Sequence, residues 1–137
     1  DVCIPFGRAR IVAEGADITV VTNSMMTIKA EKAVRQLQKE GISAELIDLR
    51  TIVPLDTETI IRSVKKTGKL LIVDEGHLSF GITGEIASRI MPDVFYDLDA
   101  PIQRMGTADV PLPFSPALEF PLIPDEKKIA AKIREMV

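Results

Sequence analysis

The chain has no tryptophan, one tyrosine, one histidine and one cysteine among its 137 residues. The lone cysteine, Cys3, excludes a disulfide within the chain. With His77 as the lone histidine, a CxxC pair or a Cys/His metal cluster is excluded as well. Sparse cysteine usage is typical of a reducing compartment, so we expect a cytoplasmic location.

Long apolar runs and a large excess of one charge are also absent. Leu70–Val73 is among the longest apolar stretches, far below the roughly 20 residues that span a bilayer, so we expect no membrane contact. Lys and Arg number 17 against 20 Asp and Glu, a net charge of −3. Without clustered basic residues to neutralise phosphates, we expect no nucleic-acid partner.

What is present is an ordinary globular composition, 46% hydrophobic, at the usual length of one domain. Apolar runs alternate with amphipathic stretches, a pattern that predicts an α/β fold with a parallel sheet. Because Asp1 is not Met, we expect a piece of a longer chain. The predicted strands are Ile18–Thr22, Ala44–Asp48, Lys69–Asp74 (inside the sheet), Val94–Leu98 and Gln103–Met105. Four helices are predicted. The first is capped by Ser24 and the second by Asp56. The third begins at Ile82 and ends at Pro92, and the last begins near Pro124.

Five prolines lie within residues 109–124. Because proline cannot donate a hydrogen bond to a sheet, we expect this segment to wrap irregularly over the surface.

The most site-like stretch is the predicted loop from Asp74 through His77 to Gly81 and Glu85. It leaves a strand at its carboxyl end and enters a helix, where open parallel sheets bind ligands and helix amides bind anions. One interpretation is a free-standing phosphate- or nucleotide-binding domain. The other is a tight turn, in which glycines let the helix pack closely on the sheet.

Single residues near this stretch have similar alternatives. His77 is either a proton carrier or a loop and interface residue. Glu75 and Glu85 are either acid–base groups or surface carboxylates at a helix start. For Arg50 we favour bracing of a loop or a subunit contact over catalysis.

Taken in order, several short motifs carry a family likeness. They begin with Asp48–Asp56 (DLRTIVPLD) and Val73–Glu75, continue through Gly81 and Gly84–Ile86, and end with Leu98–Pro101, Arg104, Asp109–Pro111, Pro113 and Leu118–Glu119. The sequence resembles the C-terminal, transketolase-like domain of the β subunit of a thiamine diphosphate-dependent 2-oxo acid dehydrogenase, of the pyruvate or acetoin type. One departure is Phe80, where the family usually has a second glycine before Gly81.

The resemblance implies a three-layer α/β/α domain over residues 10–137 with a mixed five-stranded sheet, whose antiparallel strand is Arg10–Ala13. Residues 1–9 would be a linker from a missing N-terminal pyrimidine-binding domain. Thiamine diphosphate and magnesium would be held elsewhere in the enzyme. We therefore expect no catalytic, cofactor-binding or metal-binding residue here and no activity of this fragment alone.

The resemblance also implies partners: a second β subunit, the α subunit and the subunit-binding domain of a dihydrolipoyl acyltransferase, in the mitochondrial matrix for a eukaryotic enzyme. Asp99 and a C-terminal carboxylate at Val137 would receive basic side chains of that small domain; the alternative for Asp99 is that it only caps a turn. Pro101 disfavours helix at Ala100, so the turn should present Asp99 outward. We expect Phe114 to join the contact between β subunits.

Overall fold

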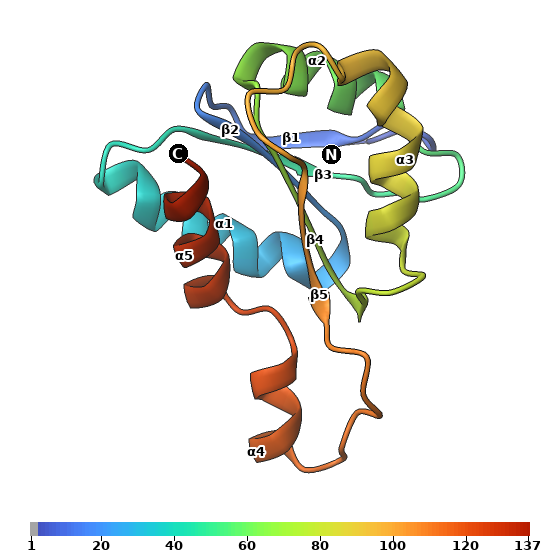
Figure 1. Ribbon diagram of the computed structural model, residues 1–137, viewed down its shortest axis with the longest axis vertical. Coiled ribbons are helices and arrows are strands. Elements are labelled where there is room, and N and C mark those ends of the chain that lie inside the picture. The colour runs from blue at the N-terminus through green and yellow to red at the C-terminus, as the bar shows by residue number, and fades with distance from the viewer. Residues whose placement is uncertain (1–2) are drawn as a thin grey trace.

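A computed structural model describes residues 3–137 as five strands in one sheet, with helices on both faces (Figure 1). The strand order is β1-β3-β2-β4-β5, with β1 antiparallel to β3 and the other pairs parallel. The strands are β1 (Arg10–Ala13), β2 (Ile18–Thr22), β3 (Ala44–Asp48), β4 (Leu70–His77) and β5 (Gln103–Thr107). The helices are α1 (Ser24–Lys39), α2 (Thr57–Thr67), α3 (Ile82–Val94), α4 (Pro116–Glu119), the 3-10 helix η1 (Phe120–Leu122) and α5 (Glu126–Met136).

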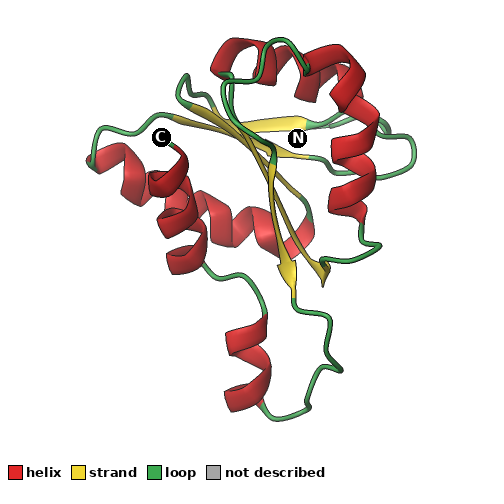
Figure 2. Cartoon of the chain, in the orientation of Figure 1, coloured by secondary structure: helices red, strands yellow, loops and turns green. Residues whose placement is uncertain are grey.

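The helices form two outer layers. α1 and α5 cover one face of the sheet, while α2 and α3 cover the other (Figure 2). Each face has its own buried apolar cluster, one around Val20 and Leu46 and the other around Val21 and Ile47. Alternate residues of one strand thus serve opposite faces, as the twofold repeat of a strand requires. The predicted three-layer α/β/α fold with a mixed five-stranded sheet and an antiparallel Arg10–Ala13 strand is confirmed.

Full burial of the inner strands follows from this layering. Every residue of β2 and β3 is buried, including Thr19 and Glu45. β4 pairs with β2 on one side and β5 on the other, so its predicted position inside the sheet is confirmed. The middle of the sheet, however, is β2.

The predicted cap of α2 is confirmed, because the carboxylate of Asp56 accepts the backbone N–H of Thr59 at 3.1 Å. The last helix begins at Glu126, slightly later than predicted, because Asp125 is its N-cap and accepts the backbone N–H of Lys128 at 2.8 Å. The predicted cap of α1 is wrong, because its N-cap is Asn23 and Ser24 is the first helical residue.

Two element boundaries also differ from expectation. Residues 94–98 are not a strand, because α3 continues to Val94, whose side chain completes the buried face of that helix. Pro92 does not end α3; its ring lies on the exposed side. β4 is longer than predicted and reaches His77, so the loop that follows it begins at Leu78.

The proline-rich segment does not wrap over the surface. Residues 108–124, which we call the arm, project beyond the carboxyl edge of the sheet and carry α4 and η1 (Figure 1). Prolines at the starts of α4 and η1 suit helix first turns, which need no N–H donor there. The exposed large apolar side chains of the arm are Val110, Leu112, Phe114, Leu118 and Phe120.

The described part of the predicted linker is held against the domain. The backbone N–H of Gly7 donates to Thr51 Oγ1 at 3.0 Å, and that of Ala9 donates to Asp56 Oδ2 at 2.9 Å. Residues 1 and 2 lie outside the described residues.

Candidate functional site

The junction between α2 and β4 lies at the edge of the sheet where the parallel strands begin. Gly68 ends α2 in a left-handed conformation, with φ of 70°. Its carbonyl oxygen accepts the backbone N–H of Asp99 at 2.8 Å. A Cβ atom at Gly68 would lie 2.1 Å from Asp99 Oδ2, so only glycine leaves room for this carboxylate. The exposed Asp99 side chain is thereby placed directly over the end of α2.

The second predicted docking residue lies beside the next position of the chain. Lys69 Nζ donates to the backbone oxygen of Val137 at 3.4 Å. Asp99 and Val137 are 38 positions apart in sequence, yet each contacts one of two consecutive residues, Gly68 and Lys69. The fold therefore brings the two predicted docking residues to one short segment.

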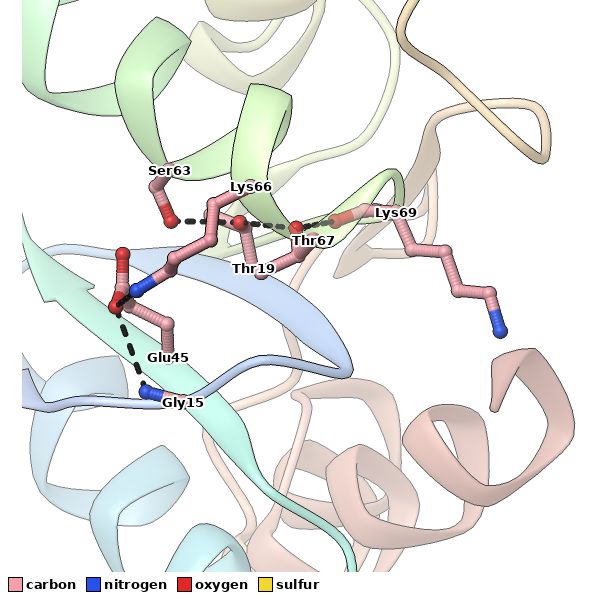
Figure 3. Close-up of polar contacts among 7 residues, drawn as sticks. All are labelled: Gly15, Thr19, Glu45, Ser63, Lys66, Thr67 and Lys69. Carbon is pink, nitrogen blue, oxygen red and sulfur yellow. Dashed lines mark hydrogen bonds and ion pairs between the residues drawn. The ribbon is translucent and has the colours of Figure 1, made fainter.

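A buried chain of hydroxyl groups fixes that segment (Figure 3). Thr19 Oγ1 lies 2.7 Å from both Ser63 Oγ and Thr67 Oγ1. Thr67 Oγ1 donates to the carbonyl oxygen of Lys69 at 3.1 Å. The chain ties the last turn of α2 to β2 and to the first residue before β4, while the Lys69 side chain extends away from the network toward α5 (Figure 3).

Glu45 extends this polar network to the start of β3. Its buried carboxylate pairs with Lys66 and accepts the backbone N–H of Gly15 at 3.4 Å. Burial alone would raise the pKa of Glu45, but the hydrogen bonds from Lys66, Ser63 and Gly15 outweigh burial and hold that pKa below its ordinary 4.5. Glu45 is thus ionised at neutral pH and anchors the C-terminal turn of α2.

An apolar groove of about 640 Å³ runs beside Asp99, between α3 and the residues that lead into β5. Arg104 is the basic residue of its lining, and Asp99 the acidic one. The full lining is Ala87, Met91, Phe95, Leu98, Asp99, Ala100, Pro101, Ile102 and Arg104.

The other predicted site residues lie elsewhere, toward the carboxyl edge of the sheet, and do not form one constellation. Arg50 is exposed, has φ of 60° and places its Nη1 3.6 Å from Asp48 Oδ2. Glu75 is exposed, and its backbone oxygen accepts the Thr107 hydroxyl at 2.7 Å. Phe114 is fully exposed on the arm.

His77 contacts the root of the arm. Its Nε2 atom lies 3.2 Å from the backbone oxygen of Val110. Beside it, the backbone N–H of Ser79 donates to Asp109 Oδ1 at 3.2 Å, and the Ser79 hydroxyl donates to Oδ2. These two hydrogen bonds hold the pKa of Asp109 below its ordinary value. This contact favours the loop and interface interpretation of His77.

The glycine loop before α3 is accounted for by packing. A Cβ at Gly81 would lie 2.1 Å from the His77 carbonyl oxygen, and one at Gly84 would lie 3.2 Å from Arg104 Nη1. That Nη1 atom donates to the Leu78 carbonyl oxygen at 3.1 Å. Phe80 has φ of 55°, the left-handed region that favours glycine, at the position where the family usually has one. These close approaches support the tight-turn interpretation.

Within residues 3–137, no three His, Cys, Asp or Glu side chains gather in a way that could hold an ion. Across the same residues, no helix has the length and apolar character that crossing a membrane requires.

The fold is a three-layer α/β domain with three distinctive surface features: a carboxylate beside a fixed helix end, an apolar groove and a projecting arm with exposed apolar side chains. The model of the transketolase C-terminal domain family matches residues 7–129, and the chain belongs to that family.

Relatives make the resemblance more specific. The chain is 47% identical to the pyruvate dehydrogenase E1 component subunit beta of Rickettsia felis over 97% of its own length and 41% of the relative's. It is 42% identical to the acetoin:2,6-dichlorophenolindophenol oxidoreductase subunit beta of Cupriavidus necator, over 96% of this chain and 39% of that one. The likeness to C-terminal domains of such β subunits, drawn from the sequence motifs, is confirmed. The chain spans about two fifths of the length of these relatives.

A solved structure agrees with the fold. A split-gene transketolase, described as an inactive β4 tetramer, superposes with a TM-score of 0.79 at 26% identity, covering 99% of this chain and 43% of that one.

Sequence reasoning missed the residues that support the junction. Thr19, Ser63 and Thr67 are polar residues at buried positions of a strand and a helix. Their one signal was the recurrence of hydroxyl residues at the buried positions of β2 and α2, because a buried hydroxyl requires a partner.

Proposed function

We propose that this chain is the assembly and docking domain of a thiamine diphosphate-dependent dehydrogenase. The whole enzyme would decarboxylate a 2-oxo acid such as pyruvate, or cleave acetoin, and pass the acyl group to a lipoyl arm. The names of the pyruvate and acetoin relatives support this class. The phosphate-binding alternative loses its basis, because packing accounts for Gly81 and Gly84.

The docking face is the α2–β4 junction. The carboxylate of Asp99 and the backbone oxygen of Val137 accept basic side chains from the subunit-binding domain of a dihydrolipoyl acyltransferase, Asp99 through charge-assisted hydrogen bonds. The observation that carries this assignment is that both residues contact the rigidly held pair Gly68–Lys69. Two acceptors on a fixed base can receive an arginine with little loss of side-chain freedom.

At this face, the Lys69 side chain competes with a basic partner for the Val137 oxygen. Its ammonium already contacts the Val137 oxygen, and an arriving arginine must displace it. Lys69 therefore lowers the net negative charge that a basic partner meets at this face.

The test measures binding of the acyltransferase's subunit-binding domain to the assembled enzyme by calorimetry. Losing one partner of a desolvated interfacial ion pair costs about 2–5 kcal/mol, so Asp99→Ala should weaken binding by roughly 30-fold or more. Asp97→Ala, which removes another exposed carboxylate two residues away, is the matched control and should change affinity little. An Asp99→Ala affinity within twofold of wild type would refute the assignment.

The other partners in this proposal are a second β subunit and the α subunit. The exposed apolar residues of the arm, Phe114 among them, suit burial against another chain. The β4 assembly named for the transketolase neighbour supports contact between β chains.

Thiamine diphosphate and magnesium would be held by other parts of the enzyme. Among the described residues, no group of three His, Cys, Asp or Glu side chains could hold the magnesium ion. The 137-residue chain alone should not decarboxylate pyruvate with both added, and turnover by the homogeneous chain would contradict this. We propose a cytoplasmic location in a bacterium and the mitochondrial matrix in a eukaryote, where some relatives are named mitochondrial.

A further inference from the structure

The segment before β1 is fastened to the loop that follows β3. The backbone N–H of Gly7 donates to Thr51 Oγ1, and that of Ala9 donates to Asp56 Oδ2. The same Thr51 hydroxyl donates to the carbonyl oxygen of Pro54 at 2.9 Å, which holds the loop in shape. A Cβ at Gly7 would lie 2.8 Å from Pro54 Cγ, so the two segments are in direct contact.

Large apolar side chains project into solvent from both sides of this contact. Phe6, one residue before Gly7, is 92% exposed, and Val53, one residue before Pro54, is 86% exposed. Its neighbour Ile52 is 42% exposed. None of these three side chains belongs to either buried apolar cluster of the domain. Within residues 3–137, this patch of Phe6, Ile52 and Val53, which we call the seat, is therefore open to another body.

We propose that the seat is covered by a domain of the same subunit that precedes this chain and is joined to it by the linker, residues 1–9. This inference rests on the proposed function, in which the chain is the C-terminal part of a longer subunit. The matched family is named for a C-terminal domain, and the chain spans 41% of the Rickettsia felis subunit. Relatives of that length have ample chain for such a domain.

The course of the linker favours this occupant over a separate chain. Phe6 is itself a linker residue, so a preceding domain begins only a few residues from the seat. A short tether gives such a domain an effective concentration in the millimolar range. A patch of three side chains is then enough to hold it, whereas a separate chain needs a much larger interface.

The direction of the linker and the place of the seat agree with this arrangement. The backbone N–H of Arg8 donates to the carbonyl oxygen of Pro5 at 3.2 Å, so the linker enters through a tight turn. Arg10, at the start of β1, pairs with Asp48, at the end of β3, which puts the seat at the carboxyl edge of the sheet. A domain on the seat therefore leaves the α2–β4 junction, at the opposite edge, free for docking.

Photo-crosslinking in the full-length subunit tests the occupant. Val53 is replaced by p-benzoylphenylalanine in the assembled enzyme, and an exposed side chain can be exchanged without disturbing the core. The expected product has the mass of a single subunit, and peptide mass spectrometry should join position 53 to a residue that precedes Asp1. The same group at Gln36, an exposed position of α1, should give at least tenfold less of this product.

Cysteine labelling measures the coverage independently. With Cys3 replaced by Ser, Val53→Cys in the full-length subunit should react with a maleimide at least tenfold more slowly than Gln36→Cys. Equal rates would overturn the proposal, because the seat would be open to solvent. Slow labelling with a cross-link to another chain, or with none to the preceding residues, would also overturn it. These results do not bear on docking at Asp99, which the acyltransferase titration measures.

Discussion

Replacing Gly68 by alanine tests how the fold places the docking carboxylate. Gly68 and Gly41 both follow a helix and both have positive φ, 70° and 87°. A left-handed conformation costs a residue with a Cβ about 1–2 kcal/mol, so both substitutions should lower the free energy of unfolding by about that amount. They differ in surroundings, because a Cβ at Gly41 has no atom within 4 Å, whereas one at Gly68 meets Asp99 Oδ2 at 2.1 Å.

Only Gly68→Ala should therefore affect docking. The added methyl group must push the Asp99 carboxylate away, so affinity for the subunit-binding domain should fall toward that of Asp99→Ala. Gly41→Ala, equally destabilised, should bind as wild type does. Urea denaturation gives the stabilities and calorimetry the affinities. Equal affinities of the two alanine variants would refute the reasoning, because they would show that the position of Asp99 over Gly68 is irrelevant to binding.

Three further substitutions test the network and the loop. Thr19→Val removes the middle hydroxyl and leaves Ser63 Oγ buried without this partner, so urea denaturation should show a loss of about 1–3 kcal/mol; a loss under 0.5 kcal/mol would contradict the network. Because the folded pKa of Glu45 lies below 4.5, its stabilisation is complete well above pH 4.5 and is lost as pH falls through the folded pKa; Glu45→Gln should remove that part of the acid dependence, and an unchanged pH profile would count against it. Lys69→Met should tighten acyltransferase docking by a few-fold at low salt, and no change there would exclude Lys69 as a competitor.

Much of the architecture followed from short-range pattern. Ile18–Thr22 has the predicted bounds because a strand buried on both faces is an unbroken apolar or β-branched run. Ala44–Asp48 also has the predicted bounds, although it includes the buried carboxylates Glu45 and Asp48. Asp56 and Gly68 bound α2 as expected, since capping depends on a few adjacent residues. The antiparallel strand Arg10–Ala13 came from family likeness, because four residues carry too little pattern to predict pairing.

The failures have a common physical origin in tertiary packing. Val94 is apolar and β-branched, which favours a strand, but its side chain packs into the core as the last residue of α3, so the helix extends past Pro92. The arm was predicted to cover the surface because prolines cannot join a sheet, yet that rule says nothing about where such a segment goes. The arm instead projects, with its apolar side chains exposed.

Part of the candidate site could be predicted from the sequence. Asp99 and Val137 came from family likeness, and sequence alone could not show that they meet the same two residues of the α2–β4 junction. Local pattern also singled out His77, Glu75 and Arg50, but it could not separate a structural role from a catalytic one. For His77 the contact of its ring with the root of the arm favours the loop and interface interpretation.

Hydrogen–deuterium exchange of the assembled enzyme, with and without the acyltransferase's subunit-binding domain, tests the central claim most directly. If the α2–β4 junction is the docking face, added protection should concentrate in residues 66–70, 97–101 and 133–137. The arm and the loop after β4 should exchange as before. Protection confined to the arm, with the junction unchanged, would contradict the account.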